Sequence, residues 1–166
     1  YVGHGSVRKA VMGRVNRTPS NSELEQMREL VKEAMNAGAL GLSTGLYYVP
    51  GNYATTEEVI ELAKIAAEHG GVYDSHIRDE SSYSIGLIGA IEEVIAIGEE
   101  AKLPVHIAHI KALGTDVWGE SEQVIKLIDN ARARGIEVSA DQYPWRASGT
   151  SVAGSLVPRE VLAGSK

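Results

Sequence analysis

The sequence predicts an α/β fold of parallel strands that alternate with helices, and three observations support this. Two short apolar runs, at 71–76 and 104–109, end in His76 and His109, which lie 33 residues apart. The interval between them has the spacing of apolar residues that is typical of a helix. The same step of 33 residues leads from these histidines to the ends of two further apolar runs. Strands that alternate with single helices in this way are parallel and joined by crossovers.

The first two elements are a strand end and a helix. Residues 1–5 read as the tail of a strand followed by a loop. A helix is then predicted from Ser22, because Ser22 and Glu25 match a capping box in which side chains and backbone donors satisfy each other. Apolar residues follow at helical spacing until Gly38, which is placed to end the helix, and a strand follows at 39–43.

The second helix repeats this pattern, with Thr55 and Glu58 as its capping box and Gly70 at its end. It leads into the strand at 71–76.

The third helix is longer and more apolar, running from about Ser84 until Pro104 prevents its continuation. After the strand at 104–109, a fourth helix ends at Gly135 and leads to a strand at 136–141.

The length predicts an incomplete barrel. A complete barrel of eight strand–helix units needs roughly 250 residues. The 166 residues therefore hold four units and the remnant of a strand. Because the chain also lacks an initiator methionine, we expect one partial domain, 1–166, that is an internal segment of a larger catalytic domain.

The composition excludes several classes of protein. A net charge of −6 without a basic cluster argues against a nucleic-acid surface, and no apolar stretch approaches the length of a membrane span. The absence of cysteine excludes disulfides and thiolate metal ligands within this segment. A cytoplasmic location is the default expectation. The open edges of a partial barrel favour self-association.

The two strand-end histidines predict a metal site. Parallel sheets of this kind carry their chemistry at the carboxyl ends of the strands, where His76 and His109 lie. Alternation places His76 on the face of Asp74 and His109 on the face of Ile107, with His106 on the opposite face, toward the helices. Two imidazoles that share one opening suit zinc. The alternative is that each histidine is a hydrogen-bonded strand-end residue, and a catalytic zinc usually needs a third protein ligand.

Two cations follow the same strand ends. Lys111 and Arg78 lie two residues past the histidines, and a cationic rim around a metal suits an anionic substrate. They could equally be loop residues paired with Asp79, Glu80 or Asp116, and the acidic residues among these read as salt-bridge or capping partners.

Two tyrosines lie in strand-end loops. Tyr48 and Tyr143 could donate hydrogen bonds to a developing oxyanion, or could be packing residues. His4, in a glycine-rich turn, is expected to be structural or to support the site from outside.

Four strings in order, GALGLSTGLYYVPG, DSHIRDES, HIAHIKALG and DQYPWRASGTS, resemble the N-acyl-D-amino-acid deacylases, or D-aminoacylases, of the amidohydrolase superfamily. The resemblance extends over essentially the whole chain, from VGHGSVR onward. It implies that the chain forms about strands 4 to 7 of a metal-dependent TIM barrel, with the end of strand 3.

The resemblance also implies roles for individual residues. His76 and His109 would bind zinc, and Tyr48, Lys111 and Tyr143 would polarise the scissile carbonyl or hold the carboxylate of an N-acyl amino acid. The family further needs a His-x-His pair, a metal-binding cysteine and an aspartate as general base, none of which this sequence contains. The isolated chain is therefore expected to bind zinc weakly and to lack turnover.

Two other functions stay open. One is a cyclic-amide hydrolase of the dihydropyrimidinase or hydantoinase type. The other is a metal-free barrel domain without catalysis. The strand end at 42–44 carries no lysine that could bridge two metals after carboxylation, which favours a site dominated by one zinc.

Overall fold

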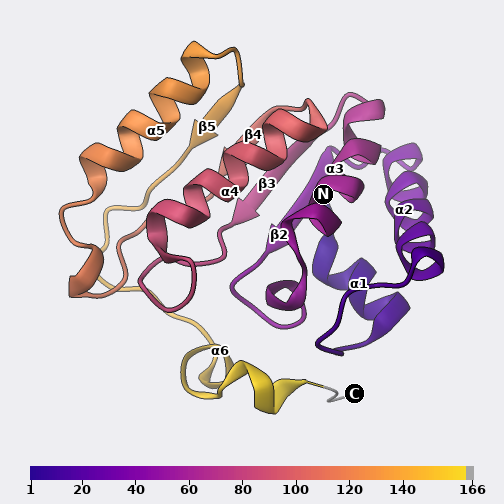
Figure 1. Cartoon of the computed structure of the whole chain (residues 1–166), viewed down its shortest axis with the longest axis horizontal. Coiled ribbons are helices and arrows are strands. Elements are labelled where there is room, and N and C mark those ends of the chain that lie inside the picture. Colours follow the sequence, from indigo (N-terminus) through magenta and orange to yellow (C-terminus); the bar gives the residue numbers. More distant parts are fainter. Residues whose placement is uncertain (164–166) are drawn as a thin grey trace.

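The computed structural model describes residues 1–163 and arranges them as one parallel sheet with helices (Figure 1). The strands are β1 (Val2–Gly3), β2 (Gly41–Gly45), β3 (Val72–His76), β4 (Val105–Ile107) and β5 (Val138–Ala140). The helices are α1 (His4–Met12), α2 (Asn21–Asn36), α3 (Thr56–Glu68), α4 (Gly86–Ala101), α5 (Ser121–Ala133) and α6 (Val152–Leu156). Short 3₁₀ helices are η1 (Gly51–Tyr53), η2 (Thr115–Val117) and η3 (Arg159–Leu162).

The strands follow one another in the sheet in chain order, β1-β2-β3-β4-β5, and every neighbouring pair is parallel. Each strand after β1 is reached through a helical crossover, so the predicted parallel α/β fold is confirmed. In such a sheet the carboxyl ends of all strands lie at the same edge. The loops that follow the strands therefore lie close together at this edge.

Helix α1 differs from the expected loop after the first strand. The chain passes directly from Gly3 into the helix, without a side-chain cap and without an acidic residue in the first turn. The usual signals of a helix start are therefore missing from the sequence. The helix is stabilised instead by burial of His4, Val7, Arg8 and Met12.

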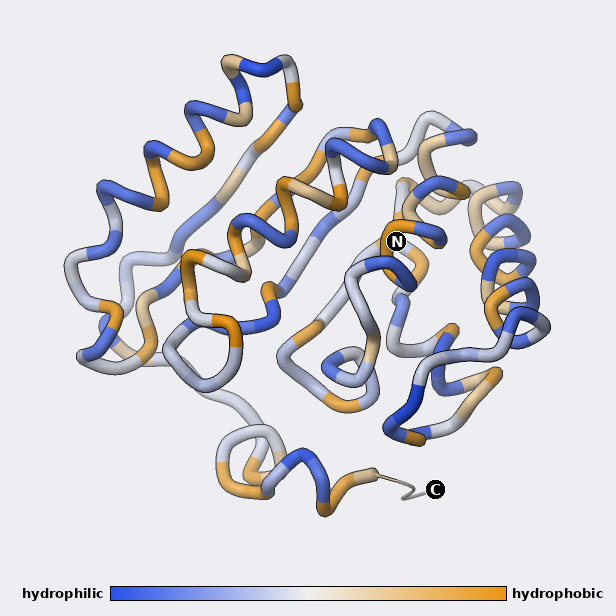
Figure 2. The backbone as a smooth tube through the Cα atoms, viewed as in Figure 1, coloured by the Kyte–Doolittle hydropathy of each residue, from blue (hydrophilic) through white to orange (hydrophobic). Residues whose placement is uncertain are grey.

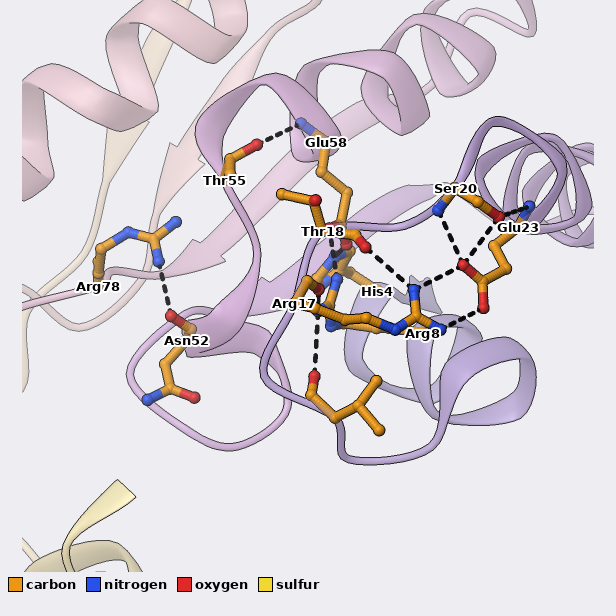
Figure 3. Close-up of polar contacts among 11 residues, drawn as sticks. His4, Arg8, Arg17, Thr18, Ser20, Glu23, Asn52, Thr55, Glu58 and Arg78 are labelled. Carbon is orange, nitrogen blue, oxygen red and sulfur yellow. Dashed lines mark hydrogen bonds and ion pairs between the residues drawn. The ribbon is translucent and has the colours of Figure 1, made fainter. Parts of the chain in front are cut away.

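The capping box of α2 lies two residues earlier than predicted. The Ser20 hydroxyl accepts from the Glu23 backbone amide at 3.3 Å, and the Glu23 carboxylate accepts from the Ser20 amide at 2.8 Å. Ser22 and Glu25 fall within the helix. The sequence contains both matches to the motif, and Glu23 is favoured because Arg17 also binds its carboxylate, as Figure 3 shows.

The other helix ends agree largely with the sequence pattern. Thr55 caps α3 by accepting from the Glu58 amide at 3.3 Å, as predicted. Gly38, Gly70 and Gly135, each with positive φ, follow α2, α3 and α5. Helix α4 ends earlier than Pro104, because Lys102 takes up the left-handed conformation at its end.

One face of the sheet packs against the helices. The side chains of Tyr73, Ser75, Val105 and Ile107 alternate along neighbouring strands and are almost fully buried. His106 pairs in register with Asp74 and thus lies on the other face, called the inner face below, which corrects the expectation that it faces the helices.

Hydropathy along the chain agrees with this layering. Blue and orange alternate turn by turn along α2 and α5 in Figure 2, as expected of helices that cover a sheet with one side and meet water with the other. Within the described residues, no helix is long and apolar enough to cross a membrane.

A buried ionic cluster joins α1 to α3 (Figure 3). The Glu58 carboxylate accepts from Arg8 and lies 2.9 Å from His4 Nε2, and the side chains of all three are nearly inaccessible. Arg8 also donates to the carbonyl of Arg17 at 2.6 Å. His4 is therefore a structural residue, as expected.

Candidate metal centre

His76 is the last residue of β3, and its side chain points to the inner face of the sheet, away from the helices. Tyr73, Ser75 and Ile77 are buried against the helices, so alternation turns His76 the other way. Burial, followed by repulsion from His109 and Lys111, lowers the pKa of His76 to about 4. The imidazole is therefore neutral near pH 7, the form that binds metals.

His109 reaches the same point by a different route from the one predicted. Strand β4 ends at Ile107, and His109 has a φ of 41°, in the left-handed region. Continued alternation would have placed His109 on the face of Ile107, toward the helices. The turn instead brings its imidazole to the inner face, beside His76.

Asp141, directly after β5, holds this turn. Its carboxylate accepts from the backbone amide of His109 and from His106, whose Nε2 lies 3.1 Å away. The Ile110 amide donates to the Asp141 carbonyl at 2.9 Å. The hydrogen bond from His109, with that from His106, lowers the pKa of the Asp141 carboxyl.

The two imidazoles are in direct contact. Nδ1 of His76 lies 3.0 Å from Nε2 of His109, and the ring centroids are 4.6 Å apart. Two nitrogens bound to one tetrahedral zinc at about 2.0–2.1 Å would lie roughly 3.3 Å apart. The spacing of the facing nitrogens thus fits a shared ion.

Glu80 and Lys111 adjoin the pair of histidines. The Glu80 carboxylate binds the Lys111 ammonium and lies 3.7 Å from His76 Nε2 and 3.5 Å from His109 Nδ1. Lys111 Nζ lies 2.9 Å from His109 Nδ1. Ligand atoms of His76, Glu80 and His109 all fall within 4.8 Å of one another.

The two predicted tyrosines also lie at this group. The Tyr48 ring centroid is 5.0 Å from that of His76, and the Tyr48 hydroxyl is bound to Thr150 at 3.1 Å. Tyr143 lies 6.5 Å from the His109 ring, with Lys111 Nζ 5.5 Å from its centroid.

These residues line one cavity of about 1270 Å³. Its wall is formed by the loops after β2, β3 and β4 and by the segment 143–162, which crosses below the strand ends in Figure 1. The cavity is large enough for a small-molecule substrate.

Arg78 is not brought to this cavity. Its guanidinium binds the Glu93 carboxylate of α4, with Nη2 at 2.7 Å, and donates to the Asn52 carbonyl at 3.2 Å. Strand β3 ends at His76, so the residues beyond it no longer follow its direction. The guanidinium of Arg78 is thus engaged in an ion pair with Glu93, and the role of Arg78 in substrate binding stays a prediction.

The acidic residues between the strands play different parts. Asp79 accepts from the amides of Ser81, Ser84 and Gly86, which caps the loop before α4, as expected of a capping residue. Glu80 does pair with Lys111, but it also contacts both histidines.

Glu80 and Asp141 are the residues at this site that sequence reasoning missed. The spacing of four residues between His76 and Glu80 was a usable signal. When a strand ends in a turn, a residue four positions later can place its side chain beside that of the last strand residue. Asp141 was visible as the last residue of its apolar run, but its bond to the His109 amide depends on the left-handed turn.

The donor set fits a divalent metal of the zinc type. Imidazole nitrogens are common zinc ligands, and the two facing nitrogens of His76 and His109 lie 3.0 Å apart. A carboxylate beside such histidines is common at zinc sites, either as a ligand or as a partner of the ligands.

Comparison with curated proteins finds clear relatives. The chain is 43% identical to the D-aminoacylase of Alcaligenes xylosoxydans over 149 residues, which is 90% of this chain and 30% of the relative. It is 38% identical to the N-acyl-D-glutamate deacylase of the same organism over the same length, again 90% of this chain and 30% of that protein. The chain thus spans about 30% of the length of these relatives. No family model matches the sequence.

Solved structures give the same result. The crystal structure of a D-aminoacylase, described as defining a novel subset of amidohydrolases, matches with a TM-score of 0.79 and 39% identity over 86% of this chain and 29% of that one. An N-acyl-D-glutamate deacylase from Bordetella bronchiseptica, in complex with zinc and a phosphonate inhibitor, matches with a TM-score of 0.80 and 38% identity over the same shares.

Sequence and structure therefore agree on the family that the strand-end motifs indicated. Over about nine tenths of its length, the chain is a homologue of the D-aminoacylases, and its five-stranded parallel sheet corresponds to part of the fold of these amidohydrolases.

Proposed function

We propose that residues 1–166 form part of the catalytic barrel of a zinc-dependent enzyme that hydrolyses the amide bond of N-acyl-D-amino acids. The main support is the contact between His76 and His109, with Lys111 beside them, at the mouth of a cavity in a homologue of deacylases. Below, the parent protein means the whole barrel protein to which this segment is proposed to belong.

His76 and His109 would hold the metal through the two nitrogens that face each other. When bound there, zinc lowers the pKa of water and polarises an acyl carbonyl. The low pKa of His76 keeps its nitrogen available, and the bond from Asp141 fixes the backbone at His109. The chain thus supplies a preformed pair of imidazole ligands.

The substrate would be held by groups on the cavity wall. Lys111 and Tyr143 lie next to each other, and their ammonium and phenol suit the carboxylate of an acyl amino acid. Tyr48, beside His76, would donate a hydrogen bond from its hydroxyl to the oxyanion that forms at the acyl carbonyl. The resemblance assigns the general base to an aspartate that this chain does not contain.

The names of the relatives support linear amides of D-amino acids as substrates. All three curated relatives are named as acylases or deacylases of D-amino acids. Rates on an N-acetyl-D-amino acid, its L-enantiomer and a dihydropyrimidine or hydantoin test this choice. Faster turnover of the cyclic amides would contradict it.

The metal assignment is tested by His109→Ala in the parent protein. The expected result is loss of bound zinc and a fall in deacylation of more than about 100-fold, because removal of a direct ligand exceeds the 10–100-fold effects of outer partners. Metal content and kcat/KM are measured on protein purified without added zinc.

The matched control is His69→Ala. His69 follows α3 at the opposite end of the strands and contacts the Ile65 carbonyl. This variant should keep metal and activity. Retained zinc with undiminished deacylation in His109→Ala would remove the assignment, and a metal-free parent protein would favour a barrel without catalysis.

A further inference from the structure

Glu80 is a buried carboxylate placed against both histidines. It is 5% exposed, and its Oε1 lies 3.7 Å from His76 Nε2 and 3.5 Å from His109 Nδ1. These are the nitrogens that do not face the other ring, since the facing pair is Nδ1 of His76 and Nε2 of His109. A single carboxylate therefore touches the outer side of the pair.

The position of Glu80 is built into the fold. Its carbonyl accepts from the Leu113 amide at 2.7 Å, which ties the loop after β3 to the loop after β4. The preceding residue, Asp79, accepts from the amides of Ser81 and Ser84 and holds the loop in shape. The carboxylate is thus fixed by its backbone and not only by its ion pair.

We propose that Glu80 is a positioning residue of the metal site, which fixes the ring orientation and the tautomer of His109, lies against His76 and at the same time holds Lys111. The inference rests on the proposed function, because it assumes that the two facing nitrogens bind one divalent cation.

The chemistry of the rings requires an acceptor at this point. Nε2 of His109 can bind a cation only when Nδ1 carries the ring proton. Lys111 Nζ, 2.9 Å from Nδ1, is a donor and cannot take that proton, whereas Glu80 Oε1, 3.5 Å from Nδ1, is an acceptor that can. Metal-binding histidines usually donate their other N–H to a carboxylate or carbonyl, which raises their basicity.

The same carboxylate also acts on the substrate side. Glu80 binds the Lys111 ammonium, which is proposed to meet the substrate carboxylate. Because the negative charge is buried, the pairing with Lys111 offsets the cost of its desolvation. Loss of the charge at Glu80 should therefore disturb both metal binding and substrate binding.

The experiment uses Glu80→Gln in the parent protein, with Glu93→Gln as the matched control. Glu93 is also a buried carboxylate in an ion pair, but its partner is Arg78 and it lies outside the cavity. Zinc affinity is measured by competition with a chelator, and KM is measured at saturating zinc. The absorption spectrum of the cobalt-substituted protein reports the number of direct ligands.

The expected result is a zinc affinity weakened 10–100-fold in Glu80→Gln, the range found for outer partners of metal-bound histidines. KM should rise, and the cobalt spectrum should keep its coordination number. Glu93→Gln should change neither affinity nor KM.

Several results would overturn the inference. Wild-type zinc affinity in Glu80→Gln, or an equal loss in Glu93→Gln, would show that Glu80 does not position the site. A changed cobalt coordination number would show that Glu80 is a direct ligand.

If Glu80→Gln does not fold, Glu80→Asp carries the same test, since the shorter side chain moves away from both rings and must also weaken zinc binding. If Glu80→Gln keeps zinc while His109→Ala loses it, only this inference fails; if His109→Ala keeps zinc, the proposed function fails.

Discussion

At the scale of the residue, the site depends on one backbone conformation. His109 lies beyond the end of β4, and its φ of 41° turns the imidazole away from the helix-facing side of the sheet and toward His76. A residue other than glycine rarely adopts this conformation and needs support from its surroundings. Asp141 gives that support through its bond to the His109 amide.

We therefore predict that Asp141→Ala weakens metal binding without removing a ligand. The turn at His109 should relax toward extended backbone, and zinc affinity of the parent protein should fall about 10-fold, the lower end of the range for supporting groups. Titration with zinc against a chelator measures this.

Asp129→Ala is the control. Asp129 is an exposed residue of α5, and its carboxylate forms an ion pair with Arg132 at 3.5 Å, away from the metal site. An unchanged affinity in Asp141→Ala would mean that the turn holds its shape without this bond.

The residue scale also shows what the sequence could and could not predict. The nearness of His76 to His109, Lys111, Tyr48 and Tyr143 followed from their common place after parallel strands. The face on which His109 lies did not follow, because alternation holds only while the chain stays extended.

At the scale of the element, α1 and α3 are joined by ions and not only by apolar packing. Glu58 lies in the first turn of α3, where its backbone amide donates to the Thr55 side chain. Its carboxylate contacts His4 and Arg8 on α1. The cap was predictable from the motif. The ionic contact was not, because it joins residues about 50 positions apart, and sequence spacing carries no information on such pairs.

We predict that Glu58→Gln destabilises the chain by about 3–5 kcal/mol, because it leaves the Arg8 cation buried without its partner. Burial opposes ionisation of Glu58, but the hydrogen bonds from His4 and Arg8 and their charges outweigh it and hold the pKa of Glu58 below its ordinary value of 4.5. Its contribution to stability is therefore complete above about pH 4.5 and is lost as the pH falls through the lower pKa of the folded state.

Urea unfolding of the wild-type chain and of Glu58→Gln between pH 3 and pH 7 tests the contribution of Glu58 to stability. The difference in the free energy of unfolding should be largest near neutral pH and should shrink below about pH 4.5. A difference that does not depend on pH would contradict the ionic account.

At the scale of the whole molecule, the predicted architecture was confirmed because it rests on periodicity. Repeated strand–helix units with short joints leave few alternatives to a parallel sheet. What periodicity could not predict was α1, whose start lacks capping signals, and the course of the segment 143–162 along the cavity.

We predict that the isolated 166-residue chain shows no turnover of N-acetyl-D-amino acids, binds zinc more weakly than the parent protein, and self-associates. The first two follow from the proposed ligands and base that it lacks, and the third from the edges of an open sheet. Enzyme assay, zinc titration and analytical ultracentrifugation measure the three properties. Measurable hydrolysis, or a monomer at concentrations of tens of micromolar, would contradict them.

The order of the strands has a further consequence for how such a molecule is made. Because each strand from β2 to β5 pairs with the strand synthesised just before it, a nascent chain emerging from the ribosome can extend the sheet by one strand–helix unit at a time. From β2 to β5, each strand finds a partner that has already been synthesised, so the sheet can grow at the rate of translation.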